Sequence, residues 1–519
     1  MKAFLRKNIY KWHRITSLVV VIPVLLWTLS GFLHPVMGLF KPQLMNHSLA
    51  ETVIDTSRIR LSPAIAFQQH NIRQINNFRI VELYNAYYYQ VKQKGVDTLS
   101  YISCFNGQWL PDGDQQYATY LAQRFLSDPD GGGQKNDHHG ASADLASVVK
   151  KQTAMKMRFN TNITAAILIT RFNNEYKSSN VLLPVYRVQF DRDDHLRLYV
   201  ETSTGKLSTA IDDKRAWFLS FFAVTHSWSF MNSWGAARHM IIGFFSLTCF
   251  LTSILGFCVY NIIKKKKKEA NSTGWWHRTI GNIFVITTLL YSFSGAWHSL
   301  QKLNHPGNEI RKQVHNEVMS DDLNLYLPAL LNKLGKSDSL LNISVVKIHH
   351  SNFWQVTTVN NKKIRKKYFN TPELNELPGG DEAYGRYLAS QFSGLPLSHI
   401  THSSQLRKFN DQYSMMKKRL PVIEVGMGDK NYYVETSTGY LSAVSRPSDK
   451  AERFSFSNFH MHHYWENWFG KEKGRSLKNI FLISSTLGLM LLAVTGMMMY
   501  RCKMKKRKLP ANYPGRSYV

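Results

Sequence analysis

Trp12-His13-Arg14 precedes the first long apolar run of the chain, and the same three residues recur as Trp276-His277-Arg278 before another apolar run. The next recurrences keep the same offset, and they are Ser30-Gly31 with Ser294-Gly295 and His34 with His298. Self-similarity of this kind predicts two repeats of one structural unit.

A second set of recurrences follows in each half at a smaller offset. Tyr199-Val-Glu-Thr-Ser-Thr-Gly205 recurs as Tyr433-Val-Glu-Thr-Ser-Thr-Gly439, and His226 recurs as His460. Six histidines therefore keep their places while much of the surrounding sequence differs. We expect paired ligand sites within a duplicated architecture.

Four apolar runs are long enough to cross a bilayer, which takes about 20 residues. They cover approximately residues 15–37, 240–263, 279–298 and 479–500. The first run is too long for the apolar part of a signal peptide and lacks a small-residue cleavage site, so we interpret it as a retained anchor. The sequence predicts an α-helical membrane protein with four transmembrane helices.

The orientation of these helices follows from the basic residues beside them. Lys and Arg gather on the cytoplasmic side of membrane proteins, and they flank the runs at the N-terminus, at 264–268 and at 503–508. Both termini are therefore expected in the cytoplasm. The expected divisions are 1–38 (N-terminus and first span), 39–239 (first outward domain), 240–263 (second span), 264–278 (basic loop), 279–298 (third span), 299–478 (second outward domain), 479–500 (fourth span) and 501–519 (basic tail).

Composition excludes several classes of protein. The formal net charge of +30 would raise nucleic acid as a partner, but the basic clusters adjoin apolar runs, so we expect no nucleic-acid partner. Of the four cysteines only Cys104 lies in an outward segment, so no disulfide is expected within the outer domains. No Cys-x-x-Cys-His occurs, which excludes covalent c-type haem.

The outward segments have the mixed pattern of α+β domains. Phe78–Val91 and Leu183–Val200 are typical of strands, and Tyr117–Leu126 is typical of a helix. Gly205 supplies the backbone freedom for a hairpin turn after Tyr199-Val-Glu201. The glycine-rich insert 128–143, which carries His138 and His139, is expected to be a loop with solvated histidines.

These hairpin segments resemble the PepSY domain, whose typical ending is a strand, an acidic residue and Thr-Gly. With the Trp-His-Arg spans and the segments around His226 and His460, nearly all of the chain resembles the PepSY-associated transmembrane family. That family includes iron-regulated inner-membrane proteins and periplasmic ferric-siderophore reductases that carry haem b. The resemblance implies two outward PepSY-like domains in the periplasm. We call His34 and His298 the opening histidines, because they end the first span of each half, and His226 and His460 the closing histidines, because they precede the last span of each half. One departure from the family is that Ser227 and Met461 follow the closing histidines, where the family often has a basic residue.

Histidines in membrane spans are unfavourable unless they are paired or face a cavity, so they are functional candidates. Neutral imidazole is also the common axial ligand of haem iron. At the outer membrane face we expect the iron of two haems b to be held by His34, His226, His298 and His460. Gly31 and Gly295 precede two of these histidines by three residues, on the same helix face, where they would let a porphyrin approach the backbone.

His13 and His277 lie one helix length, about 31 Å, from His34 and His298, which places them at the inner edge of the membrane. They are candidates for an inner haem site or, alternatively, for interfacial anchors beside Trp and Arg. The alternative for the outer four is an interfacial or packing role. His239, His462 and His463 have no counterpart in the other half and are secondary candidates. Aromatic residues near the candidates suit either a membrane belt or the wall of a haem pocket.

The expected function is electron transfer by an inner-membrane haem b protein. By resemblance the acceptor is a ferric siderophore, which reduction weakens so that iron(II) is released. No flavin or nicotinamide motif is present, so the donor is expected to be a quinol or another membrane electron donor. The alternative is a non-redox protein whose PepSY-like domains bind or regulate a partner such as a protease. A transporter for iron or its chelate is a third option, although few charges lie within the spans.

Overall fold

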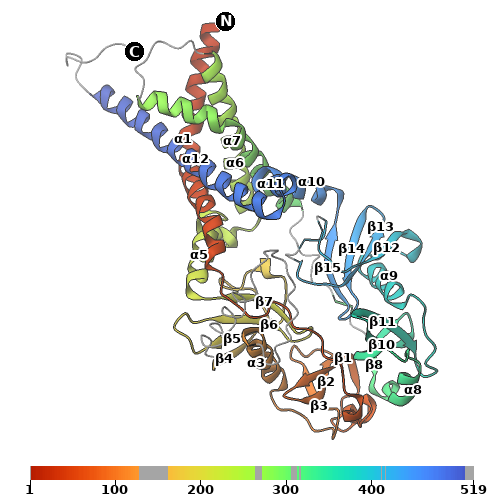
Figure 1. Ribbon diagram of the computed structural model, residues 1–519. Helices are drawn as coiled ribbons and strands as arrows, with labels where there is room; N and C mark the ends of the chain where they lie inside the picture. The colour runs from red at the N-terminus through yellow and green to blue at the C-terminus, as the bar shows by residue number, and fades with distance from the viewer. Residues whose placement is uncertain are drawn as a thin grey trace. The chain divides into compact units, whose positions relative to one another are not determined.

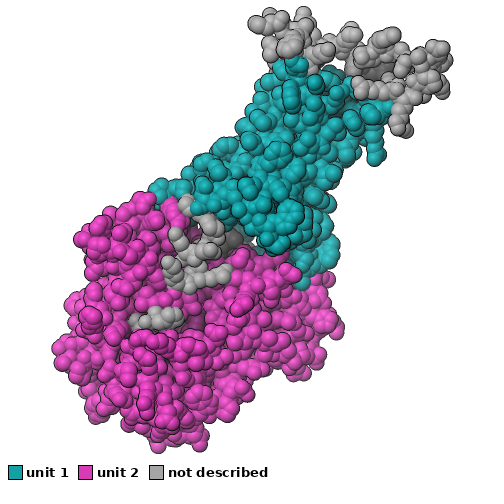
Figure 2. Space-filling view, turned by 180° about the vertical axis from the view of Figure 1, so that it is seen from behind, with its two compact units in different colours: residues 1–41, 215–308, 447–519 teal, residues 42–214, 309–446 magenta. Residues whose placement is uncertain are grey.

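The computed structural model describes residues 2–127, 162–262, 272–304, 313–314, 317–410, 412–414 and 417–508. The insert 128–143 with His138 and His139, and the lysine run 264–268, lie outside the described residues. The chain divides into two compact units, which Figure 2 colours separately. Unit 1 comprises Met1–Lys41, Arg215–Asn308 and Pro447–Val519, and unit 2 comprises Pro42–Lys214 and Glu309–Arg446.

Unit 1 is built on four long helices (Figure 1), and they are α1 (Lys2–Met37), α6 (Ala236–Ile262), α7 (Thr273–Asn304) and α12 (Lys471–Lys508). Within the described ranges, these are the four helices whose length and apolar composition suit a membrane span. The prediction of a multi-pass membrane protein with four such helices is therefore confirmed. Each helix extends beyond its apolar run, because the polar residues flanking the run continue the helix.

The four long helices contact one another as a ring in which α1 and α7 each lie against both α6 and α12. Small residues permit the close approach. A Cβ atom on Gly31 would lie 2.9 Å from Thr486 Cγ2 of α12, and one on Gly295 would lie 3.1 Å from Ser246 Oγ of α6. We expected these glycines to face a porphyrin, but each one faces a neighbouring helix, as small residues commonly do in membrane bundles.

Unit 1 also contains short helical segments near the outer histidines, and they are α5 (Asp213–Thr225), η4 (Ser229–Trp234), α10 (Pro447–Ser455), the π-turn η8 (Phe456–His460) and α11 (Tyr464–Phe469). All of this material lies within the ranges 39–239 and 299–478, which the sequence predicts as outward domains. It groups with the long helices instead, because its aromatic side chains pack on them. Trp228, for example, stacks on Trp27 of α1 with 5.4 Å between ring centroids.

Unit 2 combines antiparallel sheets with short helices, which confirms the α+β prediction. Its strands are β1 (Gln74–Leu83), β2 (Ala86–Gln93), β3 (Ser100–Ser103), β4 (Ile163–Ile169), β5 (Val185–Phe190), β6 (Arg197–Glu201), β7 (Lys206–Ile211), β8 (Val318–Met319), β9 (Ser339–Ile348), β10 (Ser351–Asn360), β11 (Lys363–Asn370), β12 (Ile400–Leu406), β13 (Val422–Met427), β14 (Lys430–Glu435) and β15 (Tyr440–Ser445). Its helices are α2 (Pro63–Gln68), α3 (Gly113–Leu126), α8 (Leu327–Asn332) and α9 (Gly380–Ser393), and its 3-10 turns are η2 (Thr56–Arg58), η3 (Ser178–Asn180), η5 (Ser320–Leu323) and η6 (Leu397–His399).

The elements follow the same order in both halves of the chain. The order α2, β1 to β3, α3, β4 to β7 and α5 matches the order α8, β9 to β11, α9, β12 to β15 and α10. The sheets have the strand orders β3-β2-β1-β8, β4-β5-β6-β7, β11-β10-β9 and β12-β13-β14-β15.

The two outward segments share one hydrophobic cluster, and each segment also has a cluster of its own. Phe78 of β1 meets Trp354 of β10 edge to face, with 6.3 Å between ring centroids. Strand β8, from the second half, also pairs with β1. These contacts group the two outward segments in one compact unit.

The repeated Thr-Ser-Thr-Gly turns connect β6 to β7 and β14 to β15. Gly205 and Gly439 have φ values of +67° and +69°, a left-handed conformation that favours glycine. The Thr202 carbonyl accepts a hydrogen bond from Gln90 at 3.1 Å, and the Thr436 carbonyl accepts one from Gln355 at 3.0 Å. The hairpin predicted at Gly205 is confirmed.

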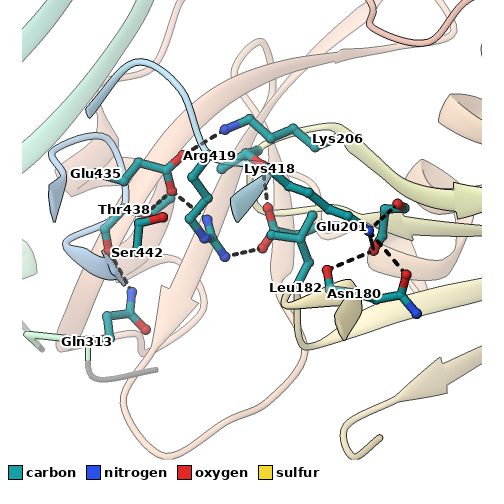
Figure 3. Close-up of polar contacts among 12 residues, drawn as sticks. Asn180, Leu182, Glu201, Lys206, Gln313, Lys418, Arg419, Glu435, Thr438 and Ser442 are labelled. Carbon is teal, nitrogen blue, oxygen red and sulfur yellow. Dashed lines mark hydrogen bonds and ion pairs between the residues drawn. The ribbon is translucent and has the colours of Figure 1, made fainter. Parts of the chain in front are cut away.

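Buried charges join the two hairpins of unit 2 (Figure 3). Arg419 bonds to Glu201 at 2.6 Å and to Glu435 at 2.5 Å, and Lys206 bonds to Glu435 at 2.7 Å. Side chains of Arg419 and both glutamates are at most 4% exposed. The repeated glutamate therefore has a structural role that ties the two halves of unit 2 together.

Candidate functional site

His226 and His460 meet within unit 1. His226 follows α5, which continues by one bond because its N–H donates to the Phe222 carbonyl at 2.8 Å. His460 ends the π-turn η8. Their ring centroids lie 5.9 Å apart with an angle of 78° between the planes. The closing histidines of the two halves are thus direct neighbours.

A phenylalanine connects the two candidate histidines within each half. Phe222 stacks on His226 at 4.5 Å and lies 5.7 Å from His34. In the other half, Phe456 stacks on His460 at 5.0 Å and lies 5.5 Å from His298. The sequence did not say whether opening and closing histidines meet within one half. In the structure each opening histidine shares a phenylalanine with the closing histidine of its own half, and the two closing histidines contact each other.

Ser30 fixes the orientation of His226. The Ser30 hydroxyl lies 2.9 Å from His226 Nδ1 and also donates to the Trp27 carbonyl at 2.9 Å. Because the hydroxyl proton is used on that carbonyl, its oxygen accepts from Nδ1–H, which leaves the Nε2 lone pair free. Trp27 adds a bond from its indole N–H to the His226 carbonyl at 3.1 Å.

The corresponding pair in the second half is not bonded. Ser294 matches Ser30, and His460 matches His226. Both the Ser294 hydroxyl and His460 Nδ1 are buried without a hydrogen-bond partner. Buried polar groups are rarely left in this state, and each such group calls for an explanation.

His298 has a carboxylate partner. Its Nδ1 lies 2.5 Å from Glu452 Oε1, which extends from α10. A carboxylate accepts only, so Nδ1 donates and Nε2 remains available. Both side chains are partly accessible, at 43% for the histidine and 21% for the glutamate.

His34 lies beside a buried cation of α12. Lys478 and His463 lie close enough to the His34 ring to interact with it electrostatically. Lys478 forms an ion pair with Glu466 and lies 3.4 Å from His463 Nδ1. The secondary candidate His463 is thereby brought next to one of the primary ones, although it is held by charged neighbours.

The secondary candidate His462 is enclosed by aromatic rings. Its side chain is fully buried, and its ring centroid lies 5.1 Å from that of Tyr291 and 4.8 Å from that of Phe481. Neither ring nitrogen has a partner at hydrogen-bond geometry. Burial lowers the pKa of His462 to about 4, against a smaller opposing effect of the Asn458 backbone. The remaining candidate, His239, lies within electrostatic reach of His298 and Lys302.

The two Trp-His-Arg histidines occupy equivalent positions at the other end of the bundle. His13 Nδ1 lies 3.1 Å from the Thr252 carbonyl of α6, and His277 Nδ1 lies 3.1 Å from the Leu492 carbonyl of α12. A carbonyl accepts only, so both histidines donate through Nδ1 and keep Nε2 free. Glycines face them, since a Cβ on Gly256 would lie 3.0 Å from His13 Cε1.

Burial keeps the closing histidines neutral. Burial and the neighbouring His34 and His298 lower the pKa of His226 to about 4. Burial and His226 lower the pKa of His460 to about 3. Although each ring keeps some accessible surface, both are uncharged at neutral pH, the form in which imidazole binds a metal.

The donor set fits b-type haem better than a free metal ion. Within the described residues no group of three or more His, Cys, Asp and Glu side chains could hold an ion. Haem iron needs only axial ligands from the protein. Histidines whose Nδ1 is bonded and whose Nε2 is free have the arrangement common to metal-ligating histidines.

Several residues of this site were not foreseen from the sequence. Ser30 and Ser294 recur in the sequence. A recurrent polar residue in an apolar run is a signal that could have identified them as part of the site. Glu452 and Lys478 have no recurrent partner of the same type, so duplication could not reveal them.

One protein family has a model that matches the chain over residues 10–503, nearly its whole length, and it is described as the PepSY-associated TM region. The match includes every candidate histidine named above. A search of curated proteins finds no match.

Proposed function

Because the chain belongs to the family with a PepSY-associated TM region, we propose that it is a duplicated haem b protein of the bacterial inner membrane. Its proposed activity is to transfer electrons from a quinol or another membrane donor to a ferric siderophore in the periplasm. Both termini lie in the cytoplasm in this proposal, and unit 2 lies outside, as the basic flanks indicate.

The observation that carries the proposal is the convergence of four recurrent histidines. His34, Phe222 and His226 form one continuous set of rings, and His298, Phe456 and His460 form the other. A packing role alone does not account for imidazoles at all four positions, because apolar side chains would fill the space without polar atoms to satisfy.

His13, His226, His277 and His298 would contribute through Nε2, because their Nδ1 atoms are already bonded. His34, His226, His298 and His460 would hold the outer haem iron, and His13 with His277 would hold an inner one. When bound, haem supplies a one-electron couple, and the protein provides ligation, orientation and exclusion of water. Phe222 and Phe456 cover the rings that would bind iron, and bundle packing holds His13 and His277 against backbone carbonyls.

The overall reaction balances for a two-electron donor. One quinol gives two electrons and two protons and becomes a quinone, and two iron(III) centres each accept one electron. Hard oxygen ligands hold iron(II) less well than iron(III), so the metal is released from its chelate. No covalent bond to the protein is made or broken.

The first experiment is an absorption spectrum of the purified full chain from haem-replete cells. A Soret band that shifts on reduction with dithionite is expected, with haem quantified as its pyridine haemochrome. The reduced protein should then be reoxidised by a ferric siderophore, with iron(II) trapped by a ferrous chelator. No reoxidation by any hydroxamate, catecholate or citrate-type ferric chelate would remove the reductase proposal.

The competing proposal is a non-redox protein whose outer unit binds a partner protein. Unit 2 contains a hollow of about 550 Å³ whose mainly apolar lining comes from both halves and includes Phe78, Tyr89 and Ile343. A well-folded preparation without any Soret absorbance would favour this alternative.

A further inference from the structure

The opening histidines of the two halves, His34 and His298, have different neighbours. His298 donates to Glu452 at 2.5 Å. Glu452 stands eight residues before His460, and the residue eight before His226 is Phe218. Phe218 stacks on Phe40 with 5.1 Å between ring centroids. One recurrent histidine therefore has a carboxylate partner where the other half carries an aromatic ring.

A cation does not offset this difference. Lys478 of α12 lies near His34. Helices α6 and α12 can be aligned by their contacts with the inner histidines: Thr252 and Gly256 contact His13, and Leu492 and Gly496 contact His277. In this alignment Arg238 of α6 occupies the position of Lys478. Basic residues are thus present at both places. Lys478 is itself paired with Glu466, so a carboxylate stands near both sites. The direct bond from the His298 ring to Glu452 is the feature that distinguishes the halves.

A carboxylate on Nδ1 changes what the imidazole does for a metal. It fixes the ring orientation and makes Nε2 a stronger electron donor. A nearby negative charge also favours the more positive oxidation state of iron. The partial exposure of the pair, 43% and 21%, screens this effect without removing it.

We propose that Glu452 is a positioning residue that makes the two outer sites unequal, so that the iron held by His298 has a lower reduction potential than the iron held by His34. This inference rests on the proposed function, because it needs the histidines to bind haem. Electrons would then move downhill from the second half of the bundle to the first.

The test is a spectroelectrochemical titration of the purified full chain and its Glu452→Gln variant. In the wild-type protein the two outer haem irons should show different reduction potentials. The variant should keep its haem and raise the lower potential, with roughly a tenfold rise in the ratio of reduced to oxidised iron at a fixed poise, about 59 mV for one electron. The Glu452→Asp variant, which keeps the charge, should restore the wild-type separation.

Glu466→Gln is the matched control, because Glu466 is another partly buried carboxylate of unit 1 that contacts Lys478 and His463. It should leave the lower component unchanged. Unchanged potentials in Glu452→Gln, or equal shifts in Glu452→Gln and Glu452→Asp, would overturn the inference. If Glu452→Gln loses haem, the titration of Glu452→Asp decides, since merged components there would also overturn it.

The failure of this inference differs from the failure of the proposed function. A wild-type protein without haem defeats the proposed function itself. A wild-type protein that carries haem, but whose outer components share one potential, defeats only the role of Glu452.

Discussion

The rings of His226 and His460 stand nearly perpendicular, with centroids 5.9 Å apart, although 234 positions separate them in the chain. This contact joins the two halves of the bundle at the residues that recur most clearly. Each ring also stacks on a phenylalanine of its own half. The duplicated sites are therefore adjacent, and a change in one is expected to affect the other.

Replacement of His226 or His460 by Ala should lower the outer haem content by about half if two outer sites are independent. A larger loss would show that the contact couples them. Haem is measured as pyridine haemochrome per mole of purified chain. His402→Ala, which changes an exposed histidine of unit 2, is the control and should keep all haem. Full haem content in His34→Ala and His298→Ala would reject these two residues as ligands.

Ser30→Ala should weaken haem retention more than Ser294→Ala, although both serines are buried at recurrent positions. Only the Ser30 hydroxyl bonds to a histidine. Loss of such an outer partner typically lowers metal affinity by about 10–100-fold. Retention is measured by the transfer of haem to an excess of an apo-protein acceptor. Equal rates in the two variants would argue against the role of the hydrogen bond.

Arg419→Met should destabilise unit 2 by about 3–5 kcal/mol, because it leaves the buried Glu201 without its ion-pair partner and leaves Glu435 paired with Lys206 alone. Hydrogen–deuterium exchange of peptides from β6 and β14 in the full chain measures the effect. Lys94→Met is the control, since its ion pair with Glu317 also joins the two halves but is more than half exposed. Such surface pairs contribute about 0–1 kcal/mol. Similar exchange in the two variants would contradict the prediction.

Acid should weaken the ion pairs that Glu435 forms with Lys206 and Arg419. Burial alone would raise the pKa of Glu435, but Lys206 and Arg419 outweigh burial and lower it well below its ordinary value of 4.5. A depressed pKa in the folded state stabilises the fold above pH 4.5, and this stabilisation is lost as the pH falls further. Protection of the β14 amides, expressed relative to the intrinsic exchange rate at each pH, should fall between pH 4.5 and 3, and Glu435→Gln should reduce that fall. An equal pH response in the variant would assign the acid effect to other groups.

The sequence predicted the number of long helices, the α+β character of the outer segments and the hairpin at Gly205. These features depend on local composition and on recurrent residues. It did not predict that Phe78 and Trp354 share one core, because a contact between two distant segments leaves no local pattern. The grouping of α5 and α10 with the long helices has no local pattern either, since it depends on what these helices pack against.

For the site, recurrence identified the histidines but not their partners. Ser30 and Glu452 act through single hydrogen bonds that depend on how α1, α7 and α10 are placed. Recurrence alone does not predict hydrogen bonds, because Ser30 bonds to a histidine in one half and the matching Ser294 is unpartnered in the other.

The last prediction separates the inner histidines from the outer ones. His13 and His277 are held by the Thr252 and Leu492 carbonyls, at the end of the bundle that carries the basic flanks. If they form the entry point for electrons, His13→Ala and His277→Ala should abolish reduction by a quinol. Dithionite can reach the outer sites directly, so both variants should still be reduced by it and reoxidised by a ferric siderophore at wild-type rates. Stopped-flow absorbance at the Soret band follows both steps, and His239→Ala serves as the control for a bundle histidine outside either set. Quinol reduction at the wild-type rate in both variants would show that electrons enter elsewhere, and loss of the dithionite-driven step would show that the inner pair supports the whole bundle.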